Sequence, residues 1–443
     1  MREITYDVIG IGVGPFNLSL ACLVQPIAGL NSLFLDKSTG FNWHSGILLQ
    51  NAHLQTPFLS DLVTLADPTS PFSFLNHIKE QGRIYSFYIR ENFFLMRSEY
   101  NQYCQWAVNK LANIEFNTQV EQIEYSDSLG CYLIQSLCMK TGQIKSYRAK
   151  KLVLGTGTLP YMPGCCQKTA DKSVHSSQYL TYKKMLQSKK SITVLGSGQS
   201  AAEIYYDLLQ DIDVYGYELS WITRSPRFFP LEYNKLTLEM TSPEYVDYFY
   251  QLPAHKRERL ITDQKSLYKG INGALINDIY DLMYVKRLTN NIRVNLFTHS
   301  ELKAAEFNSV DKNFELEFFQ DEQETDYSHR TEGLVLATGY GYQLPAFMEG
   351  IASRIQWDEQ NRFAVNRNYS IDHNASEIFV QNAGLHTHGF VTPDLGMVCY
   401  RNACIIKEIT GKEYYPIEQS IAFQQFAVPQ EKIRPFELTE PSI

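Results

Sequence analysis

Two glycine-rich stretches carry the first chemical signal in the chain. The first reads GIGVGP, with Gly10, Gly12 and Gly14 after a β-rich run and Pro15 at the start of a helical pattern. Backbone N–H groups in such a loop, with the positive end of the following helix, suit a pyrophosphate. Proline fits the first helical turn, where its missing N–H would have no partner. Asp36 ends the next strand and suits ribose hydroxyls, so a dinucleotide site is favoured over a structural turn.

The second stretch, GSGQSA, has Gly196 and Gly198 and places Ala201 at the third position. The strand that follows, LSWITRSPR, ends without an acidic residue and offers Arg224 and Arg227 instead. An arginine at this place accommodates the 2′-phosphate of NADPH, so we expect NADPH in preference to NADH. The alternative is that both arginines belong to a solvated surface.

The elements around the loops follow the same order twice. YDVIGIG, PFNLSLACLV and SLFLDK have the patterns of strand, helix and strand, and SITVLG, SGQSAAEIYYDLL and LSWITR repeat them. KLVLGTGTLPYMPG and EGLVLATGYGYQLP combine a strand with Gly and Pro turn signals and are expected to cross between the two units. Two nucleotide sites joined by a return strand of this type indicate a flavoprotein that takes hydride from NADPH. We therefore predict an α/β fold of two Rossmann-like domains, for FAD and NADPH, with a small helical substrate-binding region.

The segment from about 230 to 290 interrupts this rhythm. Within it, ALINDIYDLMYVKRL predicts a long amphipathic helix with Leu275, Ile279, Leu282 and Met283 on one face. We expect this segment to be an insertion that covers a site. The expected domains are the first part of the FAD-binding domain (1–187), the NADPH-binding domain with the insertion (188–330), and the return part of the FAD-binding domain with a C-terminal substrate-site segment (331–443).

Composition narrows the classes of function. The chain has 443 residues, of which 44% are hydrophobic, as in ordinary globular domains. Its net charge of −8 comes without a basic block, so neither nucleic acid nor an anionic membrane is an expected partner. No apolar window approaches the length of a membrane span, and the protein is expected in the cytoplasm.

Cysteine and histidine spacing narrows the chemistry further. The eight cysteines form no C-x-x-C pair, and no C-x4-C pair follows the first nucleotide unit, which disfavours a disulfide reductase. The expected electron acceptor is therefore small, such as oxygen. His386 and His388 have no third ligand at metal spacing, so we expect no metal site.

Several stretches together resemble the flavin-dependent N-hydroxylating monooxygenases that act on lysine, ornithine and diamines in siderophore synthesis. The resemblance implies a reaction in which reduced flavin and oxygen form a C4a-hydroperoxide and a neutral primary amine attacks its distal oxygen, giving a hydroxylamine and water. It leaves a homo-oligomer open, since relatives are often dimers or tetramers. Within the family, the chain most resembles the members that hydroxylate histamine for acinetobactin-type siderophores. The stretches are GVGPFNLSLA, FNWHSGILL, LQTPFLSDLVTLADPTSPFSF, HSSQYL, VLGSGQSAAE, SPEYVDYF, LATGY and THGF.

The resemblance also implies site residues. It places Trp43, His44 and Gln55 near the isoalloxazine ring, and it makes Gln55 and Asn272 the catalytic candidates, with Asn272 orienting the amine by accepting an N–H. The expected cofactor-binding residues are Gly10, Gly12, Gly14, Pro15, Asp36, Trp43, His44, Gln55, Gly196, Gly198, Gln199, Ser200, Arg224, Thr338, Gly339 and Tyr340; the expected substrate-binding residues are Ser60, Leu238, Asn272 and Gly396.

Ser60 separates this chain from the amino-acid hydroxylases it resembles. Those relatives carry a lysine after the Phe-Leu of this stretch, where it meets the substrate carboxylate, whereas here Phe58 and Leu59 precede Ser60. A family asparagine that helps hold the amino-acid head falls on the apolar Leu238. Breaking one side of a buried ion pair costs about 3–5 kcal/mol, so amino acids should bind badly. We expect a decarboxylated amine, with histamine first and then putrescine or cadaverine.

Three alternatives stay open. Another cation, Lys235 or Lys269, replaces the lysine in one of them, and the substrate is then L-lysine or L-ornithine. A redox sensor without turnover is the second, and it is disfavoured because the flavin-facing residues are present. The third concerns the tyrosines of the insertion, which would offer histamine a flat slot but would look the same if packed into a core. Those tyrosines are Tyr233, Tyr245, Tyr248, Tyr250 and Tyr268.

Overall fold

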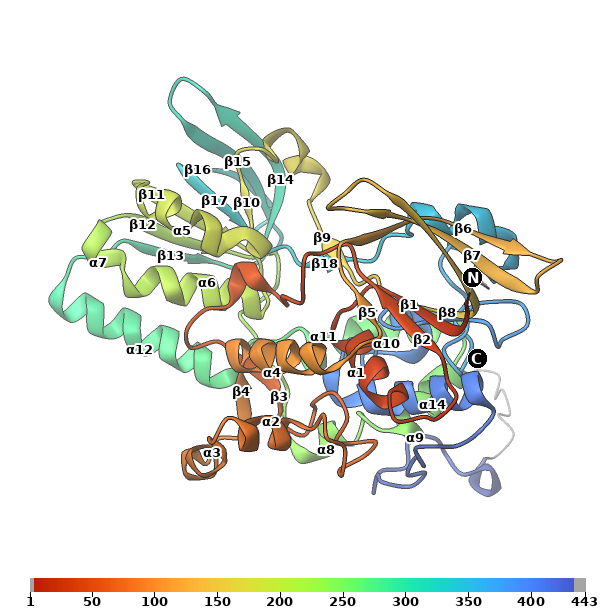
Figure 1. Ribbon diagram of the computed structural model, residues 1–443. Coiled ribbons are helices and arrows are strands. Elements are labelled where there is room, and N and C mark those ends of the chain that lie inside the picture. The colour runs from red at the N-terminus through yellow and green to blue at the C-terminus, as the bar shows by residue number, and fades with distance from the viewer. Residues whose placement is uncertain (1–3, 434–443) are drawn as a thin grey trace, which may run out of the picture.

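The computed structural model describes residues 4–433 and contains two α/β units on opposite sides of the molecule (Figure 1). In the first unit, the sheet order is β5-β2-β1-β8-β7-β6, and β19 pairs with the end of β8 that β7 leaves free. β7 runs antiparallel to both of its neighbours, β6 and β8, and all other strand pairs of this sheet are parallel. The strands are β1 (Thr5–Ile11), β2 (Ser32–Leu35), β5 (Ile114–Glu115), β6 (Thr118–Ser126), β7 (Cys131–Cys138), β8 (Ile144–Leu154) and β19 (Ile378–Val380).

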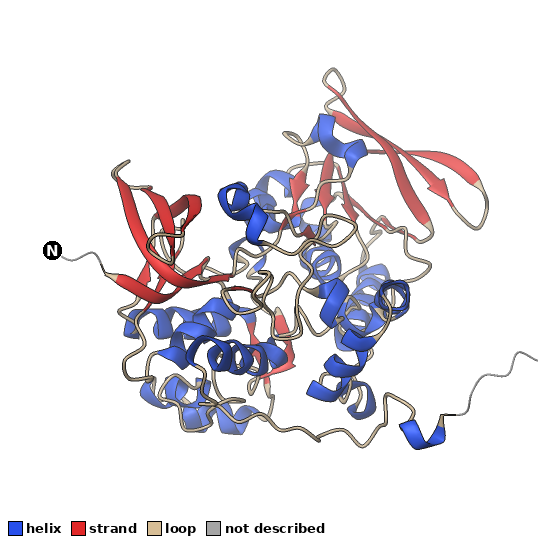
Figure 2. Ribbon diagram, turned by 90° about the vertical axis from the view of Figure 1, so that its right-hand side faces the viewer, coloured by secondary structure: helices blue, strands red, loops and turns tan. Residues whose placement is uncertain are grey.

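Helices cover one side of this sheet (Figure 2). α1 begins at Pro15 with Gly14 as its N-cap, as expected, and nearly all of its residues are buried. It is apolar on every side because it lies between the sheet and two further helices, so it shows little amphipathic pattern. The helices of this unit are α1 (Pro15–Val24), α2 (Phe74–Glu80), α3 (Ile84–Arg90), α4 (Arg97–Lys110) and α14 (Val398–Thr410), with the short hairpin β3 (His53–Pro57) and β4 (Phe94–Met96) beside them.

The second unit is a fully parallel sheet of order β10-β17-β11-β12-β13. Its edge strand β10 and the neighbouring strand β17 lie outside the range 188–330 that was expected for the NADPH-binding domain, because their pairing partners were not visible in local patterns. A three-stranded antiparallel sheet, β14-β15-β16, comes between β13 and β17 in the chain. The elements are β10 (Val174–His175), β11 (Ser191–Leu195), β12 (Glu218–Ile222), β13 (Val294–Phe297), β17 (Gly333–Leu336), β14 (Ser300–Asn308), β15 (Asn313–Gln320), β16 (Thr325–Thr331), α5 (Tyr179–Gln187), α6 (Gln199–Gln210) and α7 (Ile212–Tyr215).

The long helix α12 (Gly273–Thr289) differs in position from the expected covering insertion. Its predicted apolar face is present, since Ile279 is buried and Leu275, Leu282 and Met283 pack against the second core. Figure 1 shows α12 beside α6, and the parallel pairing of β12 with β13 makes it the crossover helix between those strands. The helical region that remains is shorter than 230–290 and ends before α12.

That helical region packs onto the C-terminal part of the chain. Tyr245, Val246 and Phe249 form one small core with Phe390 and Met397. The region therefore links the second unit to the segment just before α14. Its helices are α8 (Lys235–Leu238), α9 (Pro243–Gln251), α10 (Ala254–Asp263) and α11 (Lys265–Tyr268), and α13 (Leu385–His388) lies against α9 and α10.

The two chain crossings pair with each other. β9 (Leu159–Pro160) and β18 (Tyr340–Gly341) form a two-stranded antiparallel sheet that lies between the units (Figure 1). The second unit is thus inserted into the first through two adjacent strands. Within residues 4–433, none of the helices has the length and apolar character needed to cross a membrane.

Candidate active site

The first glycine loop has the shape that a pyrophosphate requires. Gly12 has φ of +87°, and a Cβ there would lie 2.4 Å from Gly155 O, so only glycine fits. A Cβ at Gly14 would meet nothing within 4 Å, which leaves open space at the N-terminus of α1. No side chain caps that helix, so its first N–H groups are available to an anion. Asp36 braces the loop by accepting from Val13 N at 2.6 Å. These features fit the FAD pyrophosphate and ribose.

Two of the residues assigned to the flavin ring, Trp43 and His44, belong to one aromatic cluster with Tyr340 and His175. The rings of Trp43 and His44 are 4.4 Å apart between centroids, and Tyr340 lies 6.1 Å from His44 and 5.4 Å from His175. The cluster thus joins the first unit to the return crossing, where Gly339 O accepts from Tyr161 N and Thr338 Oγ1 donates to Tyr161 O. Burial, aided by the charge of Arg97, lowers the pKa of His44 to about 4. His44 is therefore neutral at physiological pH.

The second glycine loop has a matching geometry. Gly196 has φ of +150°, and a Cβ there would lie 2.3 Å from Ala337 O. Gly198 is the N-cap of α6, which has no side-chain cap either. Burial lowers the pKa of Lys269, and the nearby charges of Lys265 and Arg224 lower it further. These cations gather beside the loop, where a Cβ on Gly198 would lie 3.7 Å from Lys269 O. The arrangement fits a dinucleotide that carries an additional phosphate.

A partly buried chain of polar contacts connects the first unit to the second glycine loop. Arg97 Nη1 of the first unit lies 2.7 Å from Glu203 Oε2 on α6, and Gln199 Nε2 donates to Glu203 Oε1 at 2.8 Å. Gln199 Oε1 in turn accepts from Asn272 N at 2.8 Å and from Gln55 Nε2 at 3.4 Å. The structure therefore brings Gln55, Gln199 and Asn272 together. Both the oxygen and the nitrogen of the Gln199 side-chain amide form hydrogen bonds with protein groups. Ser200, the next residue, lies in the same first turn of α6.

Asn272 has a local role that the sequence analysis did not foresee. Its Oδ1 accepts from Ala274 N at 2.9 Å and from Leu275 N at 3.3 Å, and so caps α12. Both lone pairs of this oxygen are engaged, which corrects the expectation that it accepts an N–H from the amine. The amide N–H groups of Asn272 remain the part of the side chain that can face a ligand.

Ser60 and Gly396 lie side by side although they come from opposite ends of the chain. Ser60 is buried, and its Oγ lies 3.4 Å from the point that a Cβ at Gly396 would occupy. Asp394 Oδ1 lies 3.2 Å from the same point and accepts from Gly396 N at 2.6 Å. Burial raises the pKa of the Asp394 carboxyl. The predicted substrate residues Ser60 and Gly396 thus share their surroundings with an acidic side chain.

The remaining candidates for the substrate site, Leu238, Lys235 and Lys269, differ in their surroundings. Leu238 is the last residue of α8 with 38% of its surface exposed, and its role at the site stays a prediction. Lys235, on the same helix, is exposed. Lys269 lies by the second glycine loop, as described above. Sequence reasoning missed Arg97, Glu203 and Asp394, whose only local signal is a charged residue within an otherwise apolar or turn-forming stretch.

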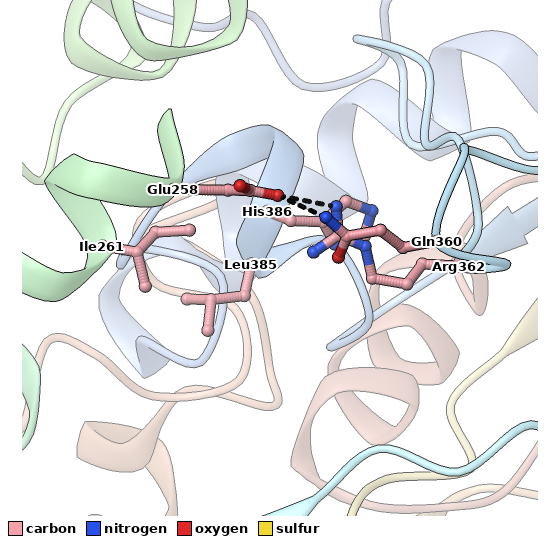
Figure 3. Close-up of a pocket in the computed structure, with 6 residues that line it drawn as sticks. All are labelled: Glu258, Ile261, Gln360, Arg362, Leu385 and His386. Carbon is pink, nitrogen blue, oxygen red and sulfur yellow. Dashed lines mark hydrogen bonds and ion pairs between the residues drawn. The ribbon is translucent and has the colours of Figure 1, made fainter. Parts of the chain in front are cut away.

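A surface cavity of about 410 Å³ lies away from these groups, between α10, α13 and the turn around Gln360. Figure 3 shows its polar side chains paired with one another: Glu258 Oε1 accepts from Gln360 Nε2 at 2.9 Å and from Arg362 Nη2 at 3.4 Å. His386 Nε2 contacts Phe363 O at 2.9 Å. None of the residues predicted for cofactor or substrate lines this cavity, and we do not regard it as the active site.

Comparison with known proteins agrees with this geometry. The family model described as L-lysine 6-monooxygenase/L-ornithine 5-monooxygenase matches residues 4–342. The putrescine N-hydroxylase of Shewanella oneidensis is 57% identical over 422 residues, which are 95% of this chain and 84% of that protein. The FAD-bound cadaverine monooxygenase of desferrioxamine biosynthesis from Erwinia amylovora superposes with a TM-score of 0.95 at 62% identity, covering 97% of this chain and 100% of that one.

A more distant structure carries both cofactors. The ornithine N-hydroxylase of Kutzneria, solved with reduced FAD, NADP⁺ and L-ornithine, has a TM-score of 0.84 at 27% identity, covering 92% of this chain and 99% of that one. In the present chain, the two glycine loops described above have a geometry that would suit these cofactors. The chain is therefore an FAD- and NADPH-dependent N-monooxygenase, and it belongs to the L-lysine 6-monooxygenase/L-ornithine 5-monooxygenase family.

Proposed function

We propose that this enzyme N-hydroxylates one end of an aliphatic diamine, putrescine or cadaverine, with FAD, NADPH and oxygen, and that the hydroxylamine serves siderophore synthesis. The observation that carries the proposal is the buried Ser60, which stands where the amino-acid hydroxylases it resembles carry a lysine. A substrate carboxylate at this place would lose its hydration and meet a hydroxyl instead of a cation. The names of the two similar proteins at 57% and 62% identity support the same substrate class.

The surroundings of Ser60 favour a cationic substrate group over an anionic one. Lys269 is placed by the NADPH loop with Arg224, and Lys235 is exposed on α8, so neither takes over the role of the missing lysine. Asp394 adds a negative charge instead. A carboxylate of L-lysine or L-ornithine would be repelled here, whereas a diamine has no carboxylate to place.

Three of the five tyrosines considered for a histamine slot are packed into the core of the helical region, whereas Tyr233 is 41% exposed and lies outside that core. Tyr245 is buried, accepts from Gln264 Nε2 at 2.6 Å, and packs with Phe390. Tyr248 and Tyr268 pack against the same core. These rings are occupied by packing, so they give no support to a flat slot for an imidazole.

The chain's own residues would position and desolvate the amine. Bound FAD, once reduced by NADPH, would activate oxygen, and one oxygen atom would pass to the amine nitrogen to form the hydroxylamine. That nitrogen must first lose its proton, and a buried site lowers an amine's pKa by disfavouring the cation. The amine's lone pair must stay free to form the N–O bond, so the protein groups around it orient the amine without donating to that lone pair. Gln199 accepts from Asn272 N and Gln55 donates to Gly270 O, which holds this segment in place. No histidine base is needed in this scheme.

Hydroxylamine formation tests the proposal. Purified FAD-loaded enzyme would be given NADPH and air with putrescine, cadaverine, histamine, L-lysine or L-ornithine at equal concentration, with reactions lacking NADPH as the control. We expect product from the two diamines and little from the amino acids. Preference for L-lysine or L-ornithine would show that another group binds the carboxylate, and preference for histamine would reverse the order proposed here.

A further inference from the structure

Asp394 is a charged side chain with an incomplete set of partners. Its Oδ1 accepts from Gly396 N, which caps the short helix that begins at Leu395. Among the described residues, no lysine or arginine forms an ion pair with it, and its Oδ2 has no hydrogen-bond partner. The residue is enclosed by protein yet keeps part of its surface accessible. A carboxylate in such a place is costly unless a cation completes it.

A purely structural explanation is that Asp394 balances the buried Arg401. The Arg401 guanidinium donates to Gln381 O at 2.9 Å and to Thr392 O at 2.7 Å, and it lies 5.0 Å from the Phe16 ring. Its charge lowers the pKa of Asp394 from a distance, against the larger effect of burial. Two N–H groups of Arg401 go to backbone carbonyls, and Arg401 forms no ion pair with Asp394 among residues 4–433. Arg401 therefore acts on the Asp394 carboxylate only from a distance.

The carboxylate lies close to the group expected to hold the substrate. Asp394 Oδ1 and Ser60 Oγ lie 3.2 and 3.4 Å from the position that a Cβ on Gly396 would take, so the two side chains approach each other where Gly396 carries none. Tyr233 is also near, since burial and then the charge of Asp394 raise the pKa of its phenol. Serine at position 60 brings a hydroxyl and no cation to this place.

We propose that Asp394 binds the distal ammonium of the diamine, with the Ser60 hydroxyl as a second contact, while the other amine is hydroxylated. This assignment rests on the proposed function and makes Asp394 the residue that selects diamines over monoamines. The distal ammonium stays protonated because the carboxylate compensates it, whereas the reacting amine, with no carboxylate near it, is neutral. One acidic side chain thereby distinguishes two chemically identical ends.

The test compares each diamine with the monoamine that has the same chain and a methyl group in place of the distal ammonium. Hydroxylamine formation would be measured for putrescine against n-butylamine and for cadaverine against n-pentylamine, in wild type, Asp394→Asn and Asp394→Glu. Loss of a charged hydrogen bond should lower kcat/KM of Asp394→Asn for diamines on the order of 10- to 100-fold. Monoamine kcat/KM and the rate of flavin reduction by NADPH should change little, and Asp394→Glu should restore part of the diamine preference.

A matched control is Asp358→Asn, since Asp358 also accepts backbone N–H groups of a turn, from Gln360 and Arg362, but lines no predicted site. It should leave the diamine preference unchanged. The proposal is overturned if Asp394→Asn lowers both substrate types equally or neither, and also if wild type hydroxylates n-butylamine as well as putrescine, a result that needs no folded variant. Diamine turnover with an unaffected Asp394→Asn would reject the subsite alone. Wild-type preference for L-lysine or histamine would reject the proposed function with it.

Discussion

Removal of one partner of the ion pair between Arg97 and Glu203 should destabilise the protein strongly, because the pair is buried and joins the two units. The side chains are 11% and 5% exposed, and the charged atoms are 2.7 Å apart. Both oxygens of Glu203 are engaged, one by Arg97 and the other by Gln199. In Glu203→Gln, the guanidinium keeps its charge without a partner, and the new amide must turn an N–H group toward one of two donors. Breaking one side of a buried pair costs about 3–5 kcal/mol, and we expect a loss of that size.

Denaturant unfolding of wild type and Glu203→Gln would measure this loss. The matched control is Glu99→Gln: Glu99 pairs with Arg83 at 2.5 Å, but Arg83 is 48% exposed and can be hydrated after the change. Its expected cost is less than about 1 kcal/mol. The double variant Arg97→Gln with Glu203→Gln should be more stable than Glu203→Gln alone, because no charge is then left buried. Equal losses in Glu203→Gln and Glu99→Gln would refute the reasoning.

Two more predictions concern groups at the cofactor loops. Burial lowers the pKa of His44 from 6.5 to about 4, so between these pH values the unfolded chain binds a proton that the folded protein does not. The contribution of His44 to the free energy of unfolding is therefore complete above pH 6.5 and falls by up to about 3 kcal/mol toward pH 4. His44→Phe should flatten this part of the stability profile in denaturant unfolding at a series of pH values, and an unchanged slope would contradict the assignment. Arg224→Ala should raise KM for NADPH by about 10- to 100-fold with little effect on NADH, because only NADPH carries the 2′-phosphate; equal effects on the two nucleotides in a steady-state assay would place Arg224 on the solvated surface.

Local patterns were enough for the elements that carry the cofactor loops. β1, α1 and β2 follow one another within about 30 residues, so glycine spacing and apolar periodicity describe them without tertiary information. The helix at Gly273–Thr289 was predicted for the same reason. Its position was not, because an apolar face does not say which surface covers it, and α12 proved to lie on α6 instead of over the site.

The parts of the site that escaped prediction are those made by contacts between distant segments. Asp394 meets Ser60 only because α14 and the segment before it return to the first unit. Arg97 and Glu203 likewise come from different units. Each of these charged residues looks ordinary in its local sequence. Its role depends on a partner in another segment, which a periodicity of 2 or 3.6 residues does not identify.

The pairing of β9 with β18 has a consequence for how the protein is made. The second unit enters and leaves through these adjacent strands, while β19 and α14 complete the first unit from the far side of the insertion. On the ribosome, the contiguous second unit can close its core as soon as β17 has emerged, but the sheet and helix layer of the first unit are complete only after β19 and α14 have emerged. The unit with the first glycine loop, which comes first in the sequence, would therefore be completed after the unit with the second glycine loop during translation.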